Sequence, residues 1–320
     1  MKRFITSDKN SYKANLHNHS TATDGRLTPE EIKREYMTQG YSIVAFTDHG
    51  NFYNQTHLTD ENFLALYGFE FGCAEYKGGH PKYYERRNCD IGIIAPSPDF
   101  KGGLGYEDTW FDYGPDIVNE VMKAYRDAGC FVIHNHPDWS LERYPDYIQY
   151  KYMHATEIFN YSSYVGGYLN PTDHVLDDML ANGKKVFAVA ADDNHNKGAV
   201  CDSFGAWCVI NAEKLDYPSV MDSLFNGKFY SSTGPEIHDL YVDDNGILRI
   251  SCSDAKMISF ITSSKVRGAV CSEDGQPINK ASFEIRNDIK YVRVIVKDYD
   301  GNCAYSNPIF TDELNTVKKA

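Results

Sequence analysis

The chain repeats one unit: a helix, a glycine, a buried apolar strand and then a group of polar residues. In the clearest copy, residues 28–31 (TPEE) predict a helix start, because the side chains of Thr28 and Glu31 can each accept a hydrogen bond from the other residue's backbone N–H. Gly40 ends that helix, and the apolar strand 42–46 follows. Alternating helices and buried strands are typical of an α/β fold in which helices cover a parallel sheet. Later copies end their helices at Gly129, Gly183 and Gly227 and continue into strands at 130–133, 186–191 and 228–232.

The strands of these units end in residues that can bind metal ions or move protons. His49 follows the first strand, and a second strand is followed by His134 and His136. The third strand precedes Asp193 and His195. Parallel α/β folds carry their chemistry at the carboxyl ends of the strands. Because so many strands end in polar groups, we expect a barrel-like closure that brings these side chains to one centre.

From about residue 236 onward, apolar and polar residues alternate and no helix pattern is visible. Val292, Val294 and Val296 illustrate the alternation, and turn signals lie at 244–246 and 300–301. We therefore expect an α/β domain at 1–234 and a small, sandwich-like all-β domain at 235–320. The sequence assigns no role to this second domain.

The acidic composition limits the partners of the chain. Its 32 Lys and Arg against 45 Asp and Glu give a net charge of −13, which disfavours binding of a polymeric nucleic acid. No apolar stretch approaches the roughly 18 residues of a membrane span, and the N-terminus lacks the apolar core of a signal peptide. The eight cysteines form no Cys-x-x-Cys pair, which favours reduced thiols. We expect a cytoplasmic protein that does not bind membranes.

The strongest local signal for a binding site is His17-x-His19, because side chains two residues apart on a strand point to the same side. Imidazole and carboxylate ligands without thiolate suit Zn, Mn or Fe. About nine candidate ligands, at three or four per ion, predict two or three divalent ions. The other candidates are Asp24, His49, Glu70, His80, His136, Asp193 and His195.

Most of these candidates belong to motifs that follow one another in a characteristic order. The order resembles that of the polymerase and histidinol phosphatase (PHP) superfamily, and more narrowly that of bacterial two-domain PHP phosphoesterases with a β-rich C-terminal domain. Arg293 and Ser306-Asn307-Pro308 extend the resemblance to nearly the whole chain. The motifs are His17-x-His19 with Asp24-Gly25, Thr47-Asp48-His49, Gly68-Phe69-Glu70, Asn135-His136-Pro137 and Asp193-x-His195.

The resemblance implies a distorted seven-stranded (β/α) barrel with a trinuclear metal site. Glu70 would bridge two of the ions. The first ion would be held by His17, His19, Glu70 and Asp193, the second by Glu70, His80 and His136, and the third by Asp24, His49 and His195.

Three residues beside these motifs have alternative roles. His80 lies in a Gly-His pair like that of the relatives but precedes Pro81, so Asp90 is the alternative ligand of the second ion. His134 forms a second His-x-His with His136, and it is a ligand, a residue of the pocket wall or a residue that supports the ligands from behind. Glu157 matches a family Glu followed by Asn, and it either orients a metal-bound histidine or forms a structural ion pair.

The implied activity is hydrolysis of a phosphate monoester by a metal-bridged hydroxide. The substrate would be a small metabolite or nucleotide, such as histidinol phosphate or a nucleoside 3′,5′-bisphosphate. The predicted catalytic residues are His195, His49 and Asp193, with His195 or His49 as the proton donor to the leaving group. The predicted phosphate-binding residues are Arg26, Arg143 and Lys197.

Two other functions stay open at this point. Similar metal barrels hydrolyse amides or lactones, and a metal-bridging carboxylated lysine would favour that class, but no lysine ends an obvious strand. A non-catalytic metal-binding module would have lost ligands, yet each motif retains its histidine or carboxylate. The β-rich domain can serve as a docking surface or as a contact between copies in a homo-oligomer.

Overall fold

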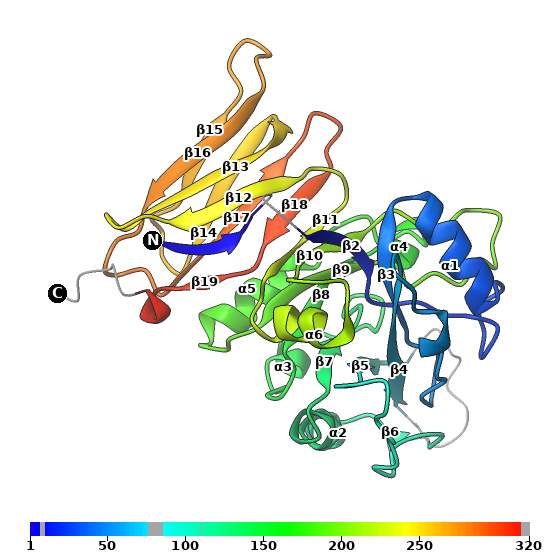
Figure 1. Ribbon diagram of the computed structural model, residues 1–320. Coiled ribbons are helices and arrows are strands. Elements are labelled where there is room, and N and C mark those ends of the chain that lie inside the picture. Colours follow the sequence, from blue (N-terminus) through cyan, green and yellow to red (C-terminus); the bar gives the residue numbers. More distant parts are fainter. Residues whose placement is uncertain (7–9, 76–85, 110, 315–320) are drawn as a thin grey trace.

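The computed structural model describes residues 1–6, 10–75, 86–109 and 111–314. In these ranges the chain is a mixed α/β protein with a 15-stranded sheet and a 4-stranded sheet (Figure 1). Its α-helices are α1 (Pro29–Thr38), α2 (Pro115–Asp127), α3 (Tyr144–Tyr147), α4 (Tyr161–Val165), α5 (Asp173–Ala181) and α6 (Tyr217–Phe225).

Seven neighbouring strands of the large sheet carry the predicted site residues. β2, β3 and β4 are parallel, and so are β7, β8 and β9. β5 lies between these groups and is antiparallel to both β4 and β7, so the expectation of a parallel sheet is wrong at β5. Antiparallel neighbours need no helical crossover. The strands are β2 (Ser11–Asn15), β3 (Tyr41–Phe46), β4 (Leu64–Ala74), β5 (Asn88–Ile94), β7 (Phe131–His134), β8 (Ala155–Asn160) and β9 (Phe187–Ala191), and β6 (Phe111–Asp112) pairs with β4.

The two ends of this seven-stranded segment meet just beyond β2 and β9. The backbone N–H of Asp193 donates to the carbonyl of His17 at 3.0 Å, and that of His19 donates to the carbonyl of Asn194 at 3.2 Å. In the described part of the chain no strand ladder joins β9 to β2. The closed seven-stranded barrel therefore stays a prediction, but the carboxyl ends of the first and last strands are joined.

The four helices that the sequence predicts, α1, α2, α5 and α6, all form, whereas the short helices α3 and α4 were not predicted. Thr28 and Glu31 make the reciprocal hydrogen bonds of a capping box at the start of α1. Helix α1 packs on β3, α2 on β5 and β7, and α5 on β8 and β9. The fourth unit departs from the expected pattern, because β11 (Phe229–Ser232) after α6 is antiparallel to its neighbours β10 (Trp207–Asn211) and β18.

The C-terminal part of the chain consists mainly of strands. The large sheet continues through β11 into β18, β17, β14 and β15, while β12, β13 and β16 form the smaller sheet. The first strand, β1 (Lys2–Ile5), pairs with β12 and so lies with this β-rich part, away from β2 (Figure 1). The expected domain division at 234 and 235 stays a prediction. The strands are β12 (Ile237–Val242), β13 (Ile247–Ala255), β14 (Met257–Thr262), β15 (Gly268–Cys271), β16 (Ile278–Glu284), β17 (Tyr291–Lys297), β18 (Cys303–Ser306) and β19 (Ile309–Phe310).

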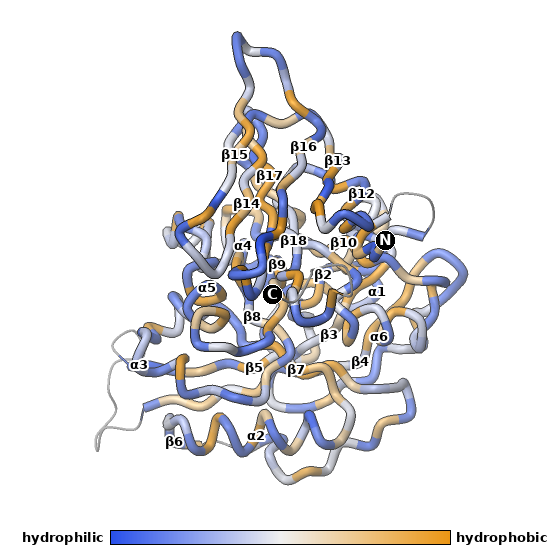
Figure 2. Tube along the Cα trace, turned by 90° about the vertical axis from the view of Figure 1, so that its left-hand side faces the viewer, coloured by the Kyte–Doolittle hydropathy of each residue, from blue (hydrophilic) through white to orange (hydrophobic). Residues whose placement is uncertain are grey.

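Apolar residues are concentrated between the sheets and the helices. Val118, Val121, Met122 and Tyr125 of α2 are fully buried against the large sheet. Figure 2 shows hydrophobic colour along the strands and a largely hydrophilic loop between β15 and β16. None of the described helices is long and apolar enough to span a bilayer.

Candidate metal centre

Eight of the nine predicted metal ligands lie in the described part of the chain, and they converge at the strand ends where β2 and β9 meet. His80 lies outside the described residues. Glu70 is the one member inside a strand, and Asp24 lies in the loop before α1. The others follow the ends of strands: His17 and His19 follow β2, His49 follows β3, His136 follows β7, and Asp193 and His195 follow β9.

The inner part of the cluster is formed by His17, His19 and Asp193. The Nε2 atoms of His17 and His19 are 3.1 Å apart. Asp193 Oδ1 lies 3.2 Å from the first Nε2 and 3.0 Å from the second. All three side chains are nearly inaccessible to solvent. Three potential ligand atoms thus surround one small buried volume.

Glu70 joins this inner part to the neighbouring imidazoles. Its Oε1 lies 3.1 Å from His17 Nε2 and 3.2 Å from His136 Nε2. Its Oε2 lies 3.3 Å from His19 Nε2 and 3.2 Å from His49 Nδ1. One carboxylate therefore faces four imidazoles, which is the arrangement expected of a residue that bridges two ions.

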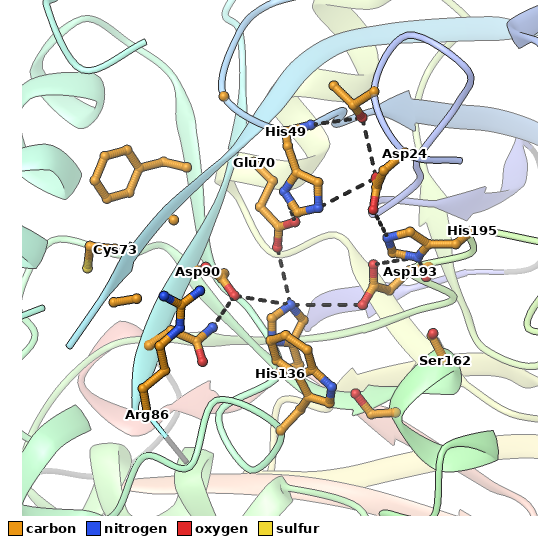
Figure 3. Close-up of a pocket in the computed structure, with 18 of the residues that line it drawn as sticks. Asp24, His49, Glu70, Cys73, Arg86, Asp90, His136, Ser162, Asp193 and His195 are labelled. Carbon is orange, nitrogen blue, oxygen red and sulfur yellow. Dashed lines mark hydrogen bonds and ion pairs between the residues drawn. The ribbon is translucent and has the colours of Figure 1, made fainter. Parts of the chain in front are cut away.

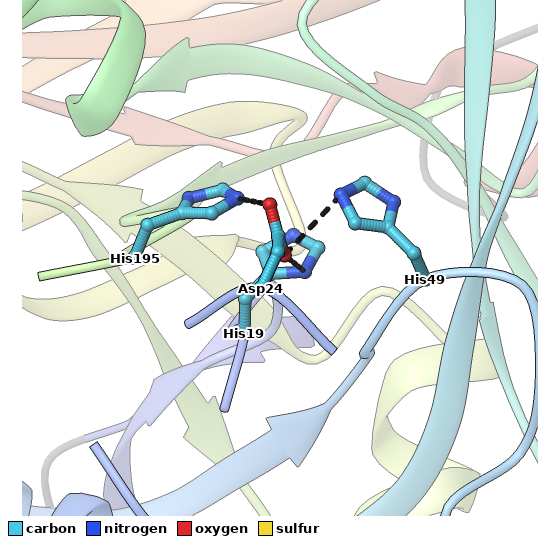
Figure 4. A group of neighbouring side chains, drawn as sticks. All are labelled: His19, Asp24, His49 and His195. Atoms are coloured by element: carbon cyan, nitrogen blue, oxygen red, sulfur yellow. Dashed lines mark ion pairs between the residues drawn. The ribbon is translucent and has the colours of Figure 1, made fainter. Parts of the chain in front are cut away.

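A second group surrounds Asp24 at the outer edge of the cluster (Figure 4). Asp24 Oδ2 lies 3.3 Å from His195 Nε2, and Oδ1 lies 3.6 Å from His49 Nε2 and 3.7 Å from His19 Nδ1. The carboxylate is about 40% exposed, in contrast to the buried inner group. His19 belongs to both groups. The family resemblance, in contrast, assigns His19 to the first ion alone.

The distances between the inner ligand atoms are close to those expected of ligands that share one transition-metal ion. Neighbouring ligands of a tetrahedral Zn ion are about 3.3 Å apart, given bond lengths of about 2.0–2.1 Å, and the inner separations are close to that value. Asp193 Oδ1 and His19 Nδ1 are buried and have no hydrogen-bond partner among the described residues. Buried polar atoms without a partner are costly. Ligation of an ion would satisfy Asp193 Oδ1.

Asp90, the alternative ligand of the second predicted ion, lies beside His136 in the structure. Asp90 Oδ2 lies 3.9 Å from His136 Nε2, and both residues can share an ion with Glu70. Burial, with a further contribution from the charge of Glu70, raises the pKa of Asp90 to about 7. The alternative ligand that the sequence offered in place of His80 is therefore within reach of the cluster.

Charge crowding perturbs the imidazoles of the cluster. Burial by itself would lower the pKa of His19, but the adjacent carboxylates of Asp193 and Glu70 outweigh burial and raise the pKa to about 9. For His136, burial is likewise outweighed by Glu70, and the pKa rises to about 10. When no metal ion is bound, protonated His19 and His136 therefore balance the negative charges of Asp193 and Glu70.

Two of the predicted ligands have strained backbones. His136 has φ 23° and Asp193 has φ 53°, in the left-handed region that residues other than glycine seldom adopt. Such strain is concentrated at functional sites and costs on the order of 1–3 kcal/mol per residue. Gly25 is needed for a different reason, since a Cβ there would lie 2.3 Å from the carbonyl oxygen of His19.

Two buried carboxylates position the predicted ligands. Glu157 Oε1 lies 2.8 Å from His17 Nδ1, and Oε2 accepts the backbone N–H of His136 at 2.9 Å. This geometry favours the orienting role over a structural ion pair. Asp48 has a role that was not predicted from the sequence. It accepts hydrogen bonds from the Ser20 backbone and the Thr23 hydroxyl, each at 2.8 Å, and so holds the loop that carries Asp24. The sequence signal that could have identified Asp48 is its position in the Thr47-Asp48-His49 motif.

Six of the eight residues of the cluster line a pocket of about 840 Å³ (Figure 3), and His17 and His19 lie behind them. His49, Asp193 and His195, the predicted catalytic residues, all line it. None of the three predicted phosphate-binding residues, Arg26, Arg143 and Lys197, lies among the lining residues. The remaining walls include Arg86, Asn88, Tyr106, Asp108, Trp139, Ser162 and Tyr168.

The third predicted phosphate ligand, Lys197, lies beside the cluster. Its Nζ donates to Asp24 Oδ2 at 2.7 Å. Arg86 is the arginine that does line the pocket, and its position next to the Asn88 and Asp90 of β5 could not be deduced from the sequence motifs.

A separate buried group consists of Cys89, His134 and Glu142. His134 Nε2 lies 2.6 Å from Glu142 Oε2, and His134 Nδ1 lies 3.2 Å from Thr156 Oγ1. The hydroxyl of Tyr150 donates to the other oxygen of Glu142. None of these residues lines the pocket, so His134 is neither a wall residue nor part of the main cluster.

Comparisons with known proteins give similar solved structures only. No family model and no curated protein matches the chain. A two-domain protein from Bacteroides vulgatus, which contains a predicted PHP-like metal-dependent phosphoesterase, is 14% identical, with 94% of this chain and 95% of that one covered and a TM-score of 0.48. Its description names the family that the sequence motifs resemble.

Two other similar structures are shorter. A candidate metal-dependent phosphoesterase from Bifidobacterium adolescentis is 14% identical, with 59% of this chain and 89% of that one covered and a TM-score of 0.37. An amidohydrolase from Chromobacterium violaceum is 13% identical, with the same coverages and a TM-score of 0.34.

Proposed function

We propose that this protein is a metal-dependent phosphoesterase that hydrolyses a phosphate monoester of a small metabolite or nucleotide. The observation that supports the proposal is the convergence of eight imidazoles and carboxylates, six of which line one pocket, with the inner separations of 3.0–3.3 Å expected of ligands that share an ion. The proposal includes two or three Zn, Mn or Fe ions, a closed barrel around them and a cytoplasmic location.

The proposed ligands divide into an inner group and an outer group. The proposed ligands of the inner ions are His17, His19, Glu70 and Asp193, together with His136 and either Asp90 or His80, while His19, Asp24, His49 and His195 surround the outer position. Divalent ions bound there would neutralise the charge of a phosphate ester and lower the pKa of a coordinated water to near neutrality.

The chain itself supplies the remaining parts of the reaction. Glu157 holds His17 in one orientation through the contact with Nδ1, which leaves Nε2 directed at the cluster. His49 and His195 are more accessible than the inner histidines and lie at the pocket side of the cluster, where whichever of the two does not ligate an ion can give a proton to the departing alkoxide. The 840 Å³ of the pocket leave room for a leaving group much larger than phosphate.

The test combines metal analysis with a panel of phosphate monoesters. Purified protein should contain two or three ions per chain and release phosphate from at least one ester. His17→Ala and Asp193→Ala should lose both properties, while His57→Ala, a change at an exposed histidine beside Glu30, should keep them. Phosphate release that survived His17→Ala and Asp193→Ala would refute the proposal. Bound metal with turnover of amides or lactones alone would replace it with the other hydrolase class.

A further inference from the structure

Lys197 contacts Asp24, the most exposed carboxylate among the proposed ligands. Its Nζ lies 2.7 Å from Asp24 Oδ2, the oxygen that also lies 3.3 Å from His195 Nε2. The other oxygen of Asp24 faces His49 and His19. An ammonium and three imidazoles therefore share a single carboxylate.

This ammonium conflicts with an ion at the outer position. While Lys197 donates to Asp24, it occupies a lone pair of a proposed ligand oxygen, and its positive charge repels a divalent ion at so short a distance. An ion can therefore bind Asp24 at the outer position only after Nζ has moved away from Oδ2.

The lysine can leave Asp24 without a change in the backbone. Asp202 accepts the backbone N–H groups of His195 and Asn196 at 2.9 and 3.0 Å, which fixes the start of the loop. The side chain of Lys197 is about 50% exposed, and its four-carbon stem has several rotatable bonds. Rotation of the side chain alone is sufficient to move the charge.

A phosphate bound in the pocket offers the displaced ammonium a new partner. Asp24 and His195 both line the pocket, so an ester bound above them places its negative oxygens within reach of Nζ. We propose that Lys197 is an exchangeable cation, which neutralises Asp24 while the outer metal position is empty and binds the phosphate of the substrate once that position is filled. This inference rests on the proposed function.

A surface ion pair elsewhere in the chain provides a matched control. Lys228 Nζ lies 2.9 Å from Asp222, and the two side chains are about 49% and 60% exposed. The corresponding values for Lys197 and Asp24 are about 50% and 40%. Asp222 and Lys228 do not line the pocket. Lys228→Met therefore repeats the charge change without touching the cluster.

The first experiment measures Mn²⁺ binding to metal-free protein by equilibrium dialysis and metal analysis. Asp24→Asn should remove one binding step, which identifies the outer ion. Lys197→Met should tighten that same step by about tenfold, because a competing charge is removed, and Lys228→Met should leave it unchanged. If Lys197→Met left the step unchanged or weakened it, the exchange would be refuted. If the wild-type chain bound no metal, the proposed function would fail and the inference with it.

The second experiment measures the binding of inorganic phosphate to the Mn²⁺-loaded protein by calorimetry. Lys197→Met should weaken phosphate binding by about tenfold through loss of one charge-assisted hydrogen bond, although it binds the outer ion more tightly. Lys197→Arg should retain most of the phosphate affinity, and Lys228→Met all of it. A merely structural lysine would not shift the two affinities in opposite directions, so unchanged phosphate binding in Lys197→Met would contradict the proposal.

Discussion

The main cluster and the Cys89–His134–Glu142 group contain similar residue types but differ in how their polar atoms are satisfied. In the small group, both oxygens of Glu142 and both ring nitrogens of His134 have partners. In the main cluster, Asp193 Oδ1 and His19 Nδ1 are buried without a hydrogen bond. The polar side-chain atoms of His134 and Glu142 are thus fully paired, whereas the main cluster contains buried potential ligand atoms without a hydrogen-bond partner.

This difference shows that the types of side chain do not identify a metal site by themselves. Cys89 and Asp90 are neighbours on β5, and successive side chains of a strand point to opposite faces. Asp90 lines the pocket, while Cys89 is packed in the apolar core with Tyr150 and Met153. Two properties distinguish the main cluster from the small group. The main cluster is accessible from the pocket, and some of its potential ligand atoms have no hydrogen-bond partner.

The largest expected effect tests the comparison with the same substitution in both groups. Glu70→Gln removes the carboxylate that faces four imidazoles, so we expect loss of at least one ion per chain and a fall in phosphatase activity of about 10³-fold or more. Glu142→Gln should retain the full metal content. Metal analysis and phosphate release measure both. Metal loss from Glu142→Gln would show that the small group also holds an ion.

A second prediction concerns the pH dependence of metal binding. His19 and His136 have raised pKa values of about 9 and 10, so bound ions must displace their protons. The apparent Mn²⁺ affinity should rise by about tenfold per pH unit for each proton released, between pH 6.5 and 8.5. Dialysis at three pH values measures the slope. An affinity independent of pH would mean that these imidazoles are not ligands.

The same raised pKa values determine how the stability of the metal-free protein depends on pH. The two imidazoles bind protons more tightly in the folded chain than in the unfolded chain, where their pKa is near 6.5. Their contribution to stability is therefore complete below about pH 6.5 and is lost as the pH rises through about 9–10. The thermal midpoint of metal-free protein should fall over this range, and that of metal-loaded protein should fall less.

A smaller effect is expected at Glu157, which orients ligands without being one. Glu157→Gln should weaken metal binding by about 10–100-fold, because the contact with His17 Nδ1 becomes neutral. The stoichiometry at saturating metal should be unchanged. Calorimetric metal titration measures both, and loss of an ion at saturation would instead make Glu157 a ligand.

The smallest effect is expected in the small group. Glu142→Gln leaves Tyr150 and His134 imperfectly paired, so the free energy of unfolding should fall by about 1–3 kcal/mol. Urea denaturation of metal-free protein measures this change. An equal loss seen only in metal-loaded protein would mean that the group acts through the metal centre after all.

Local patterns in the sequence predicted much of the centre. The capping box at residues 28–31, the glycines that end the helices and the apolar strands after them all describe interactions between near neighbours. His17 and His19 lie together because side chains alternate along an extended segment. These features depend on backbone geometry over a few residues, so they can be read from the chain itself.

His134 and His136, at and just beyond the end of β7, show the limit of predictions from local sequence patterns. Alternation would place His134 and His136 on the same side, but β7 ends at His134 and His136 has φ 23°, so one joins Glu142 and the other Glu70. Whether each histidine lies beside Glu142 or beside Glu70 cannot be predicted from the sequence, because it depends on the residue at which the strand ends.

The amino-acid sequence by itself determined most of the helices and strands that carry the site and which residues follow those strands. Only the tertiary structure decided that β5 is reversed, that β1 pairs with β12, and that Lys197 contacts Asp24, although none of Lys197, Arg26 and Arg143 lines the pocket. The physical reason is sequence separation: Lys197 and Asp24 are 173 positions apart, and no local pattern specifies a contact that depends on how the whole sheet folds.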